Sequence, residues 1–162
     1  MDTNLQKAMF GAGCFWGVEA EFRRVKGVKA TAVGYSGGRT TNPNYKDVCA
    51  HHTGHAEVVE VDFDPKEVSY EELLRVFWDC HDPTTMNRQG PDIGSQYRSA
   101  IFHHGPEQEA AARKSKEALQ VTEPYRGRKI VTEITAAQPF YSAEDYHQQY
   151  LERRGMANCH IK

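Results

Sequence analysis

The chain has 162 residues, with 20 Lys and Arg against 22 Asp and Glu, which gives a formal net charge of −2. This length can bury a hydrophobic core in one domain without disulfides. Because no basic face stands out, nucleic-acid binding is not expected. No apolar run approaches the roughly 20 residues that span a bilayer, and the N-terminus does not resemble a secretory signal. We therefore expect a cytoplasmic, monomeric protein with no membrane association.

The first half of the chain alternates strand and helix signals. A short strand is expected over 7–12. A helix follows it, because apolar residues recur at spacings of three or four over 15–25. Residues 28–35 have strand character, and 36–44, rich in Gly, Asn, Thr and Pro, are expected to form a loop. Residues 56–63 alternate well enough for a half-buried strand.

The second half begins with a clear helix start. Ser69 and Glu72 form a capping box before an apolar run. A long loop with several Pro and Gly residues is expected over 82–96, and a strand over 97–103. The remaining predictions are a surface helix, a strand and a short final helix, over 107–121, 129–137 and 142–151.

The order of the first six elements is strand, helix, strand, strand, helix, strand. This order matches a split β-α-β arrangement, so we predict an α+β, ferredoxin-like two-layer sandwich with long loops. Helices would cover one face of a mainly antiparallel sheet. We expect a single catalytic domain over residues 1–162, in which residues 152–162 form a mobile C-terminal tail.

The strongest local feature is Cys14, within the sequence GAGCFWG that begins at Gly11. It lies where a predicted strand turns into a helix, and the glycines permit a tight turn and the close approach of another molecule. The backbone N–H groups and dipole at a helix N-terminus stabilise a thiolate, so a lowered pKa is expected. The aromatic residues that follow suggest an apolar pocket. The alternative is a buried structural cysteine, which the flanking glycines disfavour.

Glu57 is the second candidate, because its position in the strand 56–63 gives it the same face as Val59, Val61 and Phe63. Burial raises the pKa of a carboxyl group. A carboxylic acid that stays protonated near neutral pH can donate a proton or a strong hydrogen bond. The alternative is an edge-strand glutamate that reaches solvent.

Two tyrosines, Tyr45 and Tyr97, stand at the ends of predicted loops, where a phenol can donate a hydrogen bond to a substrate oxygen. The chain has eight tyrosines, so composition alone does not single these two out. A different possibility is a zinc site, for which the histidine- and cysteine-bearing stretch 49–55 would supply ligands. The spacing disfavours it, because no second matching pair of ligands is present.

Four segments together resemble one known family. GCFWG at 13–17, TGHAEVV at 53–59, HDPTT at 81–85 and DIGSQYRS at 92–99 are similar in kind, order and spacing to peptide methionine sulfoxide reductase A. The resemblance runs from about residue 9 to about residue 151. It implies the fold expected above, and it implies an enzyme that needs no cofactor or metal.

The resemblance also implies a role for each matching residue. It makes Cys14 the nucleophile and Glu57 the acid that protonates the leaving oxygen. It implies that Tyr45 and Tyr97 hold the sulfoxide oxygen and that Asp92 helps to bind the substrate. Phe15 and Trp16 would hold the methyl group of the substrate. The implied substrates are oxidised proteins and free methionine sulfoxide, as the S epimer.

The reaction implied by the resemblance leaves a sulfenic acid on Cys14, which condenses readily with a second thiol. Cys159 in the C-terminal tail is the expected resolving cysteine, with Cys49 and Cys80 as alternatives. Thioredoxin would then reduce the Cys14–Cys159 disulfide. Two competing hypotheses remain, a thiol peroxidase and a binding domain without activity.

Overall fold

The structure is a computed structural model that describes residues 5–38, 40, 43–49, 53–122, 125–144 and 147–149. Its strands are β1 (Gln6–Ala12), β2 (Val28–Ser36), β3 (Ala56–Phe63), β4 (Arg88–Gln89), β5 (Asp92–Ile93), β6 (Ser99–His103), β7 (Glu133–Ala136) and β8 (Tyr141–Ser142). Its helices are α1 (Phe15–Arg23), α2 (Tyr45–Cys49), α3 (Tyr70–Asp79), the 3₁₀ helix η1 (Ser95–Tyr97) and α4 (Pro106–Gln120).

The main sheet has the strand order β7-β6-β1-β3-β2-β8. The inner strands pair antiparallel, and only β7 joins β6 in parallel. In the chain, α1 connects β1 to β2, and α3 lies between β3 and β6. The four inner strands, β6, β1, β3 and β2, therefore form the split β-α-β arrangement expected from the sequence. The prediction of an α+β, ferredoxin-like fold is confirmed.

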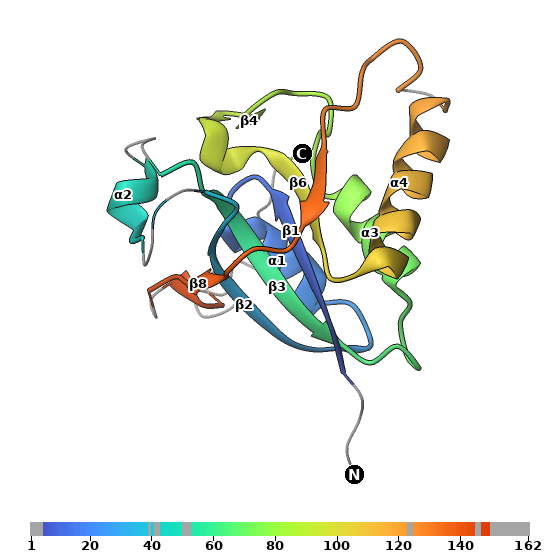
Figure 1. The fold of residues 1–162 in the computed structure, drawn as a ribbon, viewed down its shortest axis with the longest axis horizontal. Helices are drawn as coiled ribbons and strands as arrows, with labels where there is room; N and C mark the ends of the chain where they lie inside the picture. Colours follow the sequence, from blue (N-terminus) through green and yellow to red (C-terminus); the bar gives the residue numbers. More distant parts are fainter. Residues whose placement is uncertain are drawn as a thin grey trace.

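The two faces of the sheet bury different sets of side chains. On β3, Val59, Val61 and Phe63 join the large core with α1 and α3, whereas Ala56 and Val58 belong to a smaller cluster on the opposite face. Figure 1 shows α3 and α4 side by side, and the segment between β7 and β8 crossing in front of the sheet. The face beneath α1 is therefore the one that carries the odd-numbered residues of β3.

Helix α3 starts at the capping box predicted from the sequence. The Oγ of Ser69 accepts from the backbone N–H of Glu72 at 3.1 Å, and a Glu72 carboxylate oxygen accepts from the backbone N–H of Ser69 at 3.1 Å. These bonds satisfy two N–H groups that a helix otherwise leaves without partners.

Several local expectations differ from the structure. The predicted loop 82–96 contains β4 and β5, and the strand predicted over 97–103 begins only at Ser99. The short helix α2 follows directly on the predicted loop, and β7 begins only at Glu133 instead of residue 129. The predicted final helix is wrong at its start, because Ser142 pairs with Gly34 as part of β8. Part of that segment, and the tail 152–162 with Cys159, lie outside the described residues. No helix in the described part of the chain is long and apolar enough to cross a membrane.

Candidate active site

Cys14 lies at the N-terminus of α1, where β1 ends and the chain turns. Gly13 has a φ of 102°, which L side chains rarely adopt, and a Cβ at Gly13 would lie 3.0 Å from the Cβ and Cγ of Gln89. The Cys14 carbonyl accepts from the backbone N–H of Val18 in the first turn of the helix. The turn therefore needs glycine, and it leaves the half-buried Cys14 side chain at the first position before the helix.

Glu57 lies beneath this turn, on the face of β3 that packs against α1, as the sequence predicts. Its side chain is 1% exposed, and one carboxylate oxygen accepts from the backbone N–H of Phe15 at 3.2 Å. The second oxygen, Oε2, has no hydrogen-bond partner among the described residues. Burial raises the pKa of Glu57 to about 8, and the negative charge of Asp92 adds to the rise. The carboxyl group is therefore protonated at neutral pH.

The expectation of a lowered pKa for Cys14 is wrong for the resting site. Burial, together with the negative charges of Glu57 once it is ionised and of Asp92, raises the pKa of the thiol to about 12. The backbone N–H groups of Trp16 and Gly17 lower the pKa, but they do not outweigh the loss of solvent. Both Cys14 and Glu57 consequently carry protons at pH 7.

Asp92 reaches this site through a hairpin formed by β4 and β5. Gln89 pairs with Asp92 in the hairpin, and its buried side chain packs against the Gly13 turn. The Gln89 amide accepts from the backbone N–H of Asp82 at 2.9 Å and donates to the Asp82 carbonyl at 2.6 Å. These two hydrogen bonds between the Gln89 amide and the Asp82 backbone fix the hairpin against the cysteine turn. The charge of Asp92 is therefore close enough to raise the pKa of both Cys14 and Glu57.

His147 belongs to the site, although sequence reasoning missed it. The indole N–H of Trp16 donates to Nδ1 of His147 at 3.0 Å, and the ring centroids of Phe15 and Tyr45 lie 5.3 and 4.6 Å from that of His147. Because Nδ1 accepts, the neutral imidazole carries its proton on Nε2, which faces a Glu144 oxygen at 3.8 Å. Burial lowers the pKa of His147 against the opposing charge of Glu144. The imidazole thus fixes the orientation of the indole.

The next two residues hold the same segment against α1 and β2. The Gln148 amide accepts from the backbone N–H of Val33 at 2.8 Å and donates to the Val33 carbonyl at 2.9 Å. Glu19, which is 1% exposed, accepts from the backbone N–H and the side-chain amide of Gln149 at 2.8 and 2.9 Å. We call residues 147–149, with these bonds, the C-terminal clasp. It keeps this end of the described chain beside the active-site helix.

The two tyrosines reach the site from different segments. Tyr45 is the first residue of α2, and its ring contacts the imidazole that holds the indole. Tyr97 ends η1. A Cβ at Gly11 would lie 3.3 Å from the carbonyl oxygens of both Arg98 and Glu57, so the backbone that follows Tyr97 lies beside Glu57. The fold thus brings both predicted tyrosine segments to the cysteine turn.

The remaining cysteines have separate environments. Cys80 is 6% exposed within the core, and its Sγ donates to the carbonyl of Phe77 at 3.4 Å. Cys49 ends α2, but its side chain lies outside the described part of the structure. His55 is not available as a zinc ligand, because both of its ring nitrogens have backbone partners. Its Nδ1 accepts from the backbone N–H of Gly38 at 2.9 Å, and its Nε2 lies 2.7 Å from the carbonyl oxygen of Thr40.

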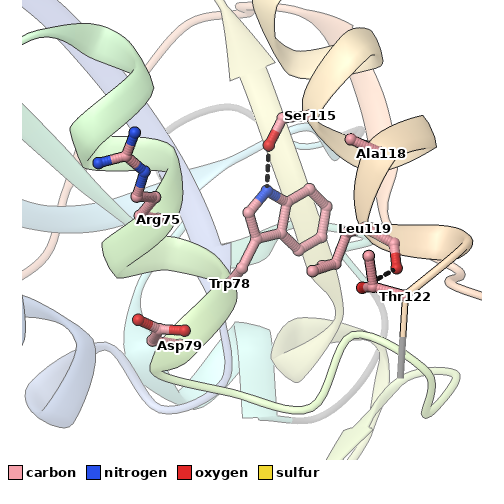
Figure 2. A pocket seen from close by; sticks show the side chains of 7 residues that line it. All are labelled: Arg75, Trp78, Asp79, Ser115, Ala118, Leu119 and Thr122. Carbon is pink, nitrogen blue, oxygen red and sulfur yellow. Dashed lines mark hydrogen bonds between the residues drawn. The ribbon is translucent and has the colours of Figure 1, made fainter. Parts of the chain in front are cut away.

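A cavity of about 350 Å³ opens elsewhere, between α3 and α4 (Figure 2). The indole N–H of Trp78 donates to the Oγ of Ser115 at 2.7 Å on its wall. The cavity is lined by Arg75, Trp78, Asp79, Ser115, Ala118, Leu119 and Thr122. Because none of these side chains is a thiol or a buried acid, the cavity is not a centre for the chemistry of Cys14.

A substitution at Gly13 tests how tightly the turn is built. Gly13→Ala should lower the free energy of unfolding by about 1–3 kcal/mol, because the residue must keep a positive φ and its Cβ meets Gln89. Urea unfolding of both proteins measures this loss. Gly90→Ala is the control, since it also has a positive φ but nothing lies within 4 Å of its Cβ. Equal losses in the two variants would show that the contact with Gln89 has no energetic weight.

The arrangement combines a cysteine, a protonated buried acid and an aromatic wall at the start of one helix. A thiol in such a site can attack an electrophilic atom, and a protonated acid beside it can donate a proton to a leaving group. These features are those of a thiol-dependent enzyme. The family of the chain follows from comparison with known proteins.

A model of the family "Peptide methionine sulfoxide reductase" matches residues 6–162. The peptide methionine sulfoxide reductase MsrA of Geobacter sulfurreducens is 61% identical over 98% of this chain and 97% of its own length. That of Methanoculleus marisnigri is 60% identical over 98% and 96%. The chain belongs to the peptide methionine sulfoxide reductase family, and it is an oxidoreductase that reduces methionine sulfoxide.

Solved structures agree with this assignment. Methionine sulfoxide reductase A of Corynebacterium diphtheriae matches with a TM-score of 0.89 and 40% identity, over 95% of this chain and 77% of that chain. Mxr1 from Saccharomyces cerevisiae in its reduced form gives 0.86 and 38%, over 93% and 86%. The same yeast protein in complex with Trx2 gives 0.63 and 28%, over 93% and 89%.

Proposed function

We propose that this enzyme reduces the S epimer of methionine sulfoxide, free or within proteins, with Cys14 as its nucleophile and Glu57 as its acid. The observation that carries the proposal is the Oε2 atom of Glu57, which is buried, without a hydrogen-bond partner among the described residues, and part of a protonated carboxyl group. A donor held in this way is free to bond to the sulfoxide oxygen. Trp16 supports the proposal as an aromatic wall for the substrate methyl group.

The chemical step moves one oxygen atom and two electrons. The Cys14 sulfur bonds to the sulfoxide sulfur, while Glu57 delivers its proton to the sulfoxide oxygen and takes up the proton of the thiol. The hydroxyl group then passes from the substrate sulfur to the Cys14 sulfur as the bond between the two sulfurs breaks, and methionine leaves as the thioether. Cys14 is left as a sulfenic acid, so the enzyme sulfur is oxidised by two electrons and the substrate sulfur is reduced by two. Tyr45 and Tyr97 would hold the oxygen by hydrogen bonds.

We propose further that Cys159 resolves the sulfenic acid and that thioredoxin reduces the resulting disulfide. The C-terminal clasp supports this proposal, because Gln149 is bonded to Glu19, and Glu19 lies about 7.5 Å along α1 from Cys14. Ten further residues extend up to about 34 Å, which exceeds the distance back to Cys14. The solved complex of the yeast relative with Trx2 favours thioredoxin as the reductant.

Removal of the proposed resolving thiol separates the chemical step from recycling. Cys159→Ser should release one methionine per enzyme at the wild-type rate, and thioredoxin-dependent turnover should fall at least about 100-fold, because no disulfide forms. Rapid-quench measurement of methionine, followed by steady-state NADPH consumption, gives both numbers. Undiminished cycling would assign the resolving role to Cys49 or Cys80, which separate substitutions then distinguish.

Thioredoxin-coupled NADPH consumption with each sulfoxide epimer tests the function as a whole. We expect turnover with the S epimer and less than about 1% of that rate with the R epimer. The reason is that Glu57 and the aromatic wall fix one orientation of the sulfoxide oxygen and the methyl group. Hydrogen peroxide in the same assay tests the peroxidase alternative. A faster reaction with peroxide than with the S epimer would overturn the proposal.

A further inference from the structure

The hairpin beside Cys14 exposes two large apolar side chains to solvent. Met86 and Ile93 are 65% and 66% exposed, which is more than any other large apolar side chain in the described residues; Val121 follows at 64%. Exposed apolar side chains that gather beside a functional site indicate contact with another molecule. Ile93 follows Asp92 in β5, and Met86 lies two residues before β4, so both belong to the segment that carries Asp92 toward Cys14 and Glu57.

This exposure does not arise from a loosely placed loop. Gln89, on the inner face of the hairpin, is 5% exposed and is bonded twice to the backbone of Asp82. The backbone N–H of Gly94 donates to the carbonyl of Asn87 at 2.9 Å and continues the pairing at the open end. Because these hydrogen bonds and the packing of Gln89 hold the hairpin in place, its exposed side chains occupy a defined position.

The two exposed side chains are close enough to be covered by a few residues of another polypeptide. Ile93 lies opposite Arg88 across the hairpin, and Met86 lies two residues before Arg88 in the chain. The Cα atoms of Met86 and Ile93 are therefore no more than about 13 Å apart. Three or four residues of an extended chain cover that distance.

We propose that Met86 and Ile93 form a docking surface for apolar side chains that flank the oxidised methionine in a polypeptide substrate. This inference rests on the proposed function, since the polypeptide must deliver its sulfoxide to Cys14. The occupant follows from position: the hairpin packs against the cysteine turn and brings Asp92 close to Cys14, so a chain whose sulfoxide reaches Cys14 passes beside Ile93, the next residue after Asp92. The partner is thus an extended segment with apolar neighbours, as an unfolded protein exposes.

Three substrates separate docking from chemistry. They are free methionine S-sulfoxide and two acetylated, amidated pentapeptides with a central methionine S-sulfoxide, one flanked by leucines and one by glycine and serine. In the double variant M86S/I93S, KM for the leucine-flanked peptide should rise about tenfold, because two apolar contacts are lost. The kcat for all three substrates, and KM for the other two, should stay within twofold of the wild type.

A matched control removes two other exposed apolar side chains. The variant L5S/V121S should leave all three KM values unchanged, because neither residue lies on the hairpin. An unchanged KM of M86S/I93S for the leucine-flanked peptide, or an equal rise for all three substrates, overturns the docking surface. Failure of the wild type to reduce any of the three substrates would instead overturn the proposed function. Melting temperatures confirm that both variants are folded.

Discussion

Replacing Cys14 by serine should lower kcat/KM for methionine S-sulfoxide by at least about 10⁴-fold. A hydroxyl is far less nucleophilic than a thiol, and it cannot carry the oxygen away as a sulfenic acid. The melting temperature should change by no more than a few degrees, because serine keeps the half-buried position at the start of α1 with nearly the same volume. The measurement is reduction of the S epimer with dithiothreitol, so that recycling by a second cysteine does not enter.

The matched control for this prediction is a cysteine outside the site. Cys80→Ala removes a sulfur from the core, where the Cys80 Sγ donates to the carbonyl of Phe77. We expect it to lower stability by about 1 kcal/mol and to keep the rate of methionine release. Retained turnover in Cys14→Ser, or an equal loss in Cys80→Ala, would remove Cys14 from the role of nucleophile.

Replacing Glu57 by glutamine should lower kcat/KM by about 10²–10³-fold. Glutamine keeps the volume, and its carbonyl oxygen can accept from the N–H of Phe15, but its amide cannot transfer a proton to the sulfoxide oxygen. In the wild type, kcat/KM should fall as the pH rises through about 8, because the acid loses its proton there. The variant should show no such fall in that range, which steady-state rates from pH 6 to 10 reveal.

The same substitution changes how stability depends on pH. The pKa of Glu57 in the folded protein, about 8, lies above its usual value of 4.5. Between these values the unfolded chain loses its proton while the folded protein keeps it, so the wild type loses stability relative to Glu57→Gln as the pH rises from about 4.5 to 8. The loss should amount to a few kcal/mol and remain constant above pH 8.

Glu60→Gln provides the control, since Glu60 is three residues further along β3, on the opposite face, and pairs with Lys7 at 3.4 Å. It should change neither the activity nor its pH dependence. A wild-type profile that stays flat through pH 8, or a Glu57→Gln variant with wild-type activity, would exclude Glu57 as the proton donor.

Much of the site could be predicted because its signals are local. The alternation of β3 alone places Glu57 on the face with Val59 and Val61, and the capping box alone marks the start of α3. Features that depend on distant packing could not be read from the sequence. His147 contacts Trp16 across 131 residues, and the pKa of Cys14 is set by burial, which a helix position in sequence does not reveal.

The local failures also have physical reasons. Helix α2 has five residues, which is too short for apolar periodicity to show. The predicted helix from Ser142 has good capping residues, but Ser142 and Tyr141 instead complete the sheet beside β2, where the backbone gains sheet hydrogen bonds. Tertiary pairing overrode local propensity at that position.

The C-terminal clasp would also set the reach of Cys159, the proposed resolving cysteine. Gln149 is bonded to Glu19, Cys159 follows ten residues later, and a flexible chain of ten residues spans about 18 Å on average. A thiol tethered within such a distance has a millimolar effective concentration near the anchored end. Under the proposed mechanism, Cys159 would then capture the sulfenic acid before a second oxidant converts it irreversibly to the sulfinic acid. Loosening the clasp should therefore shorten the working lifetime of each enzyme molecule under oxidant stress.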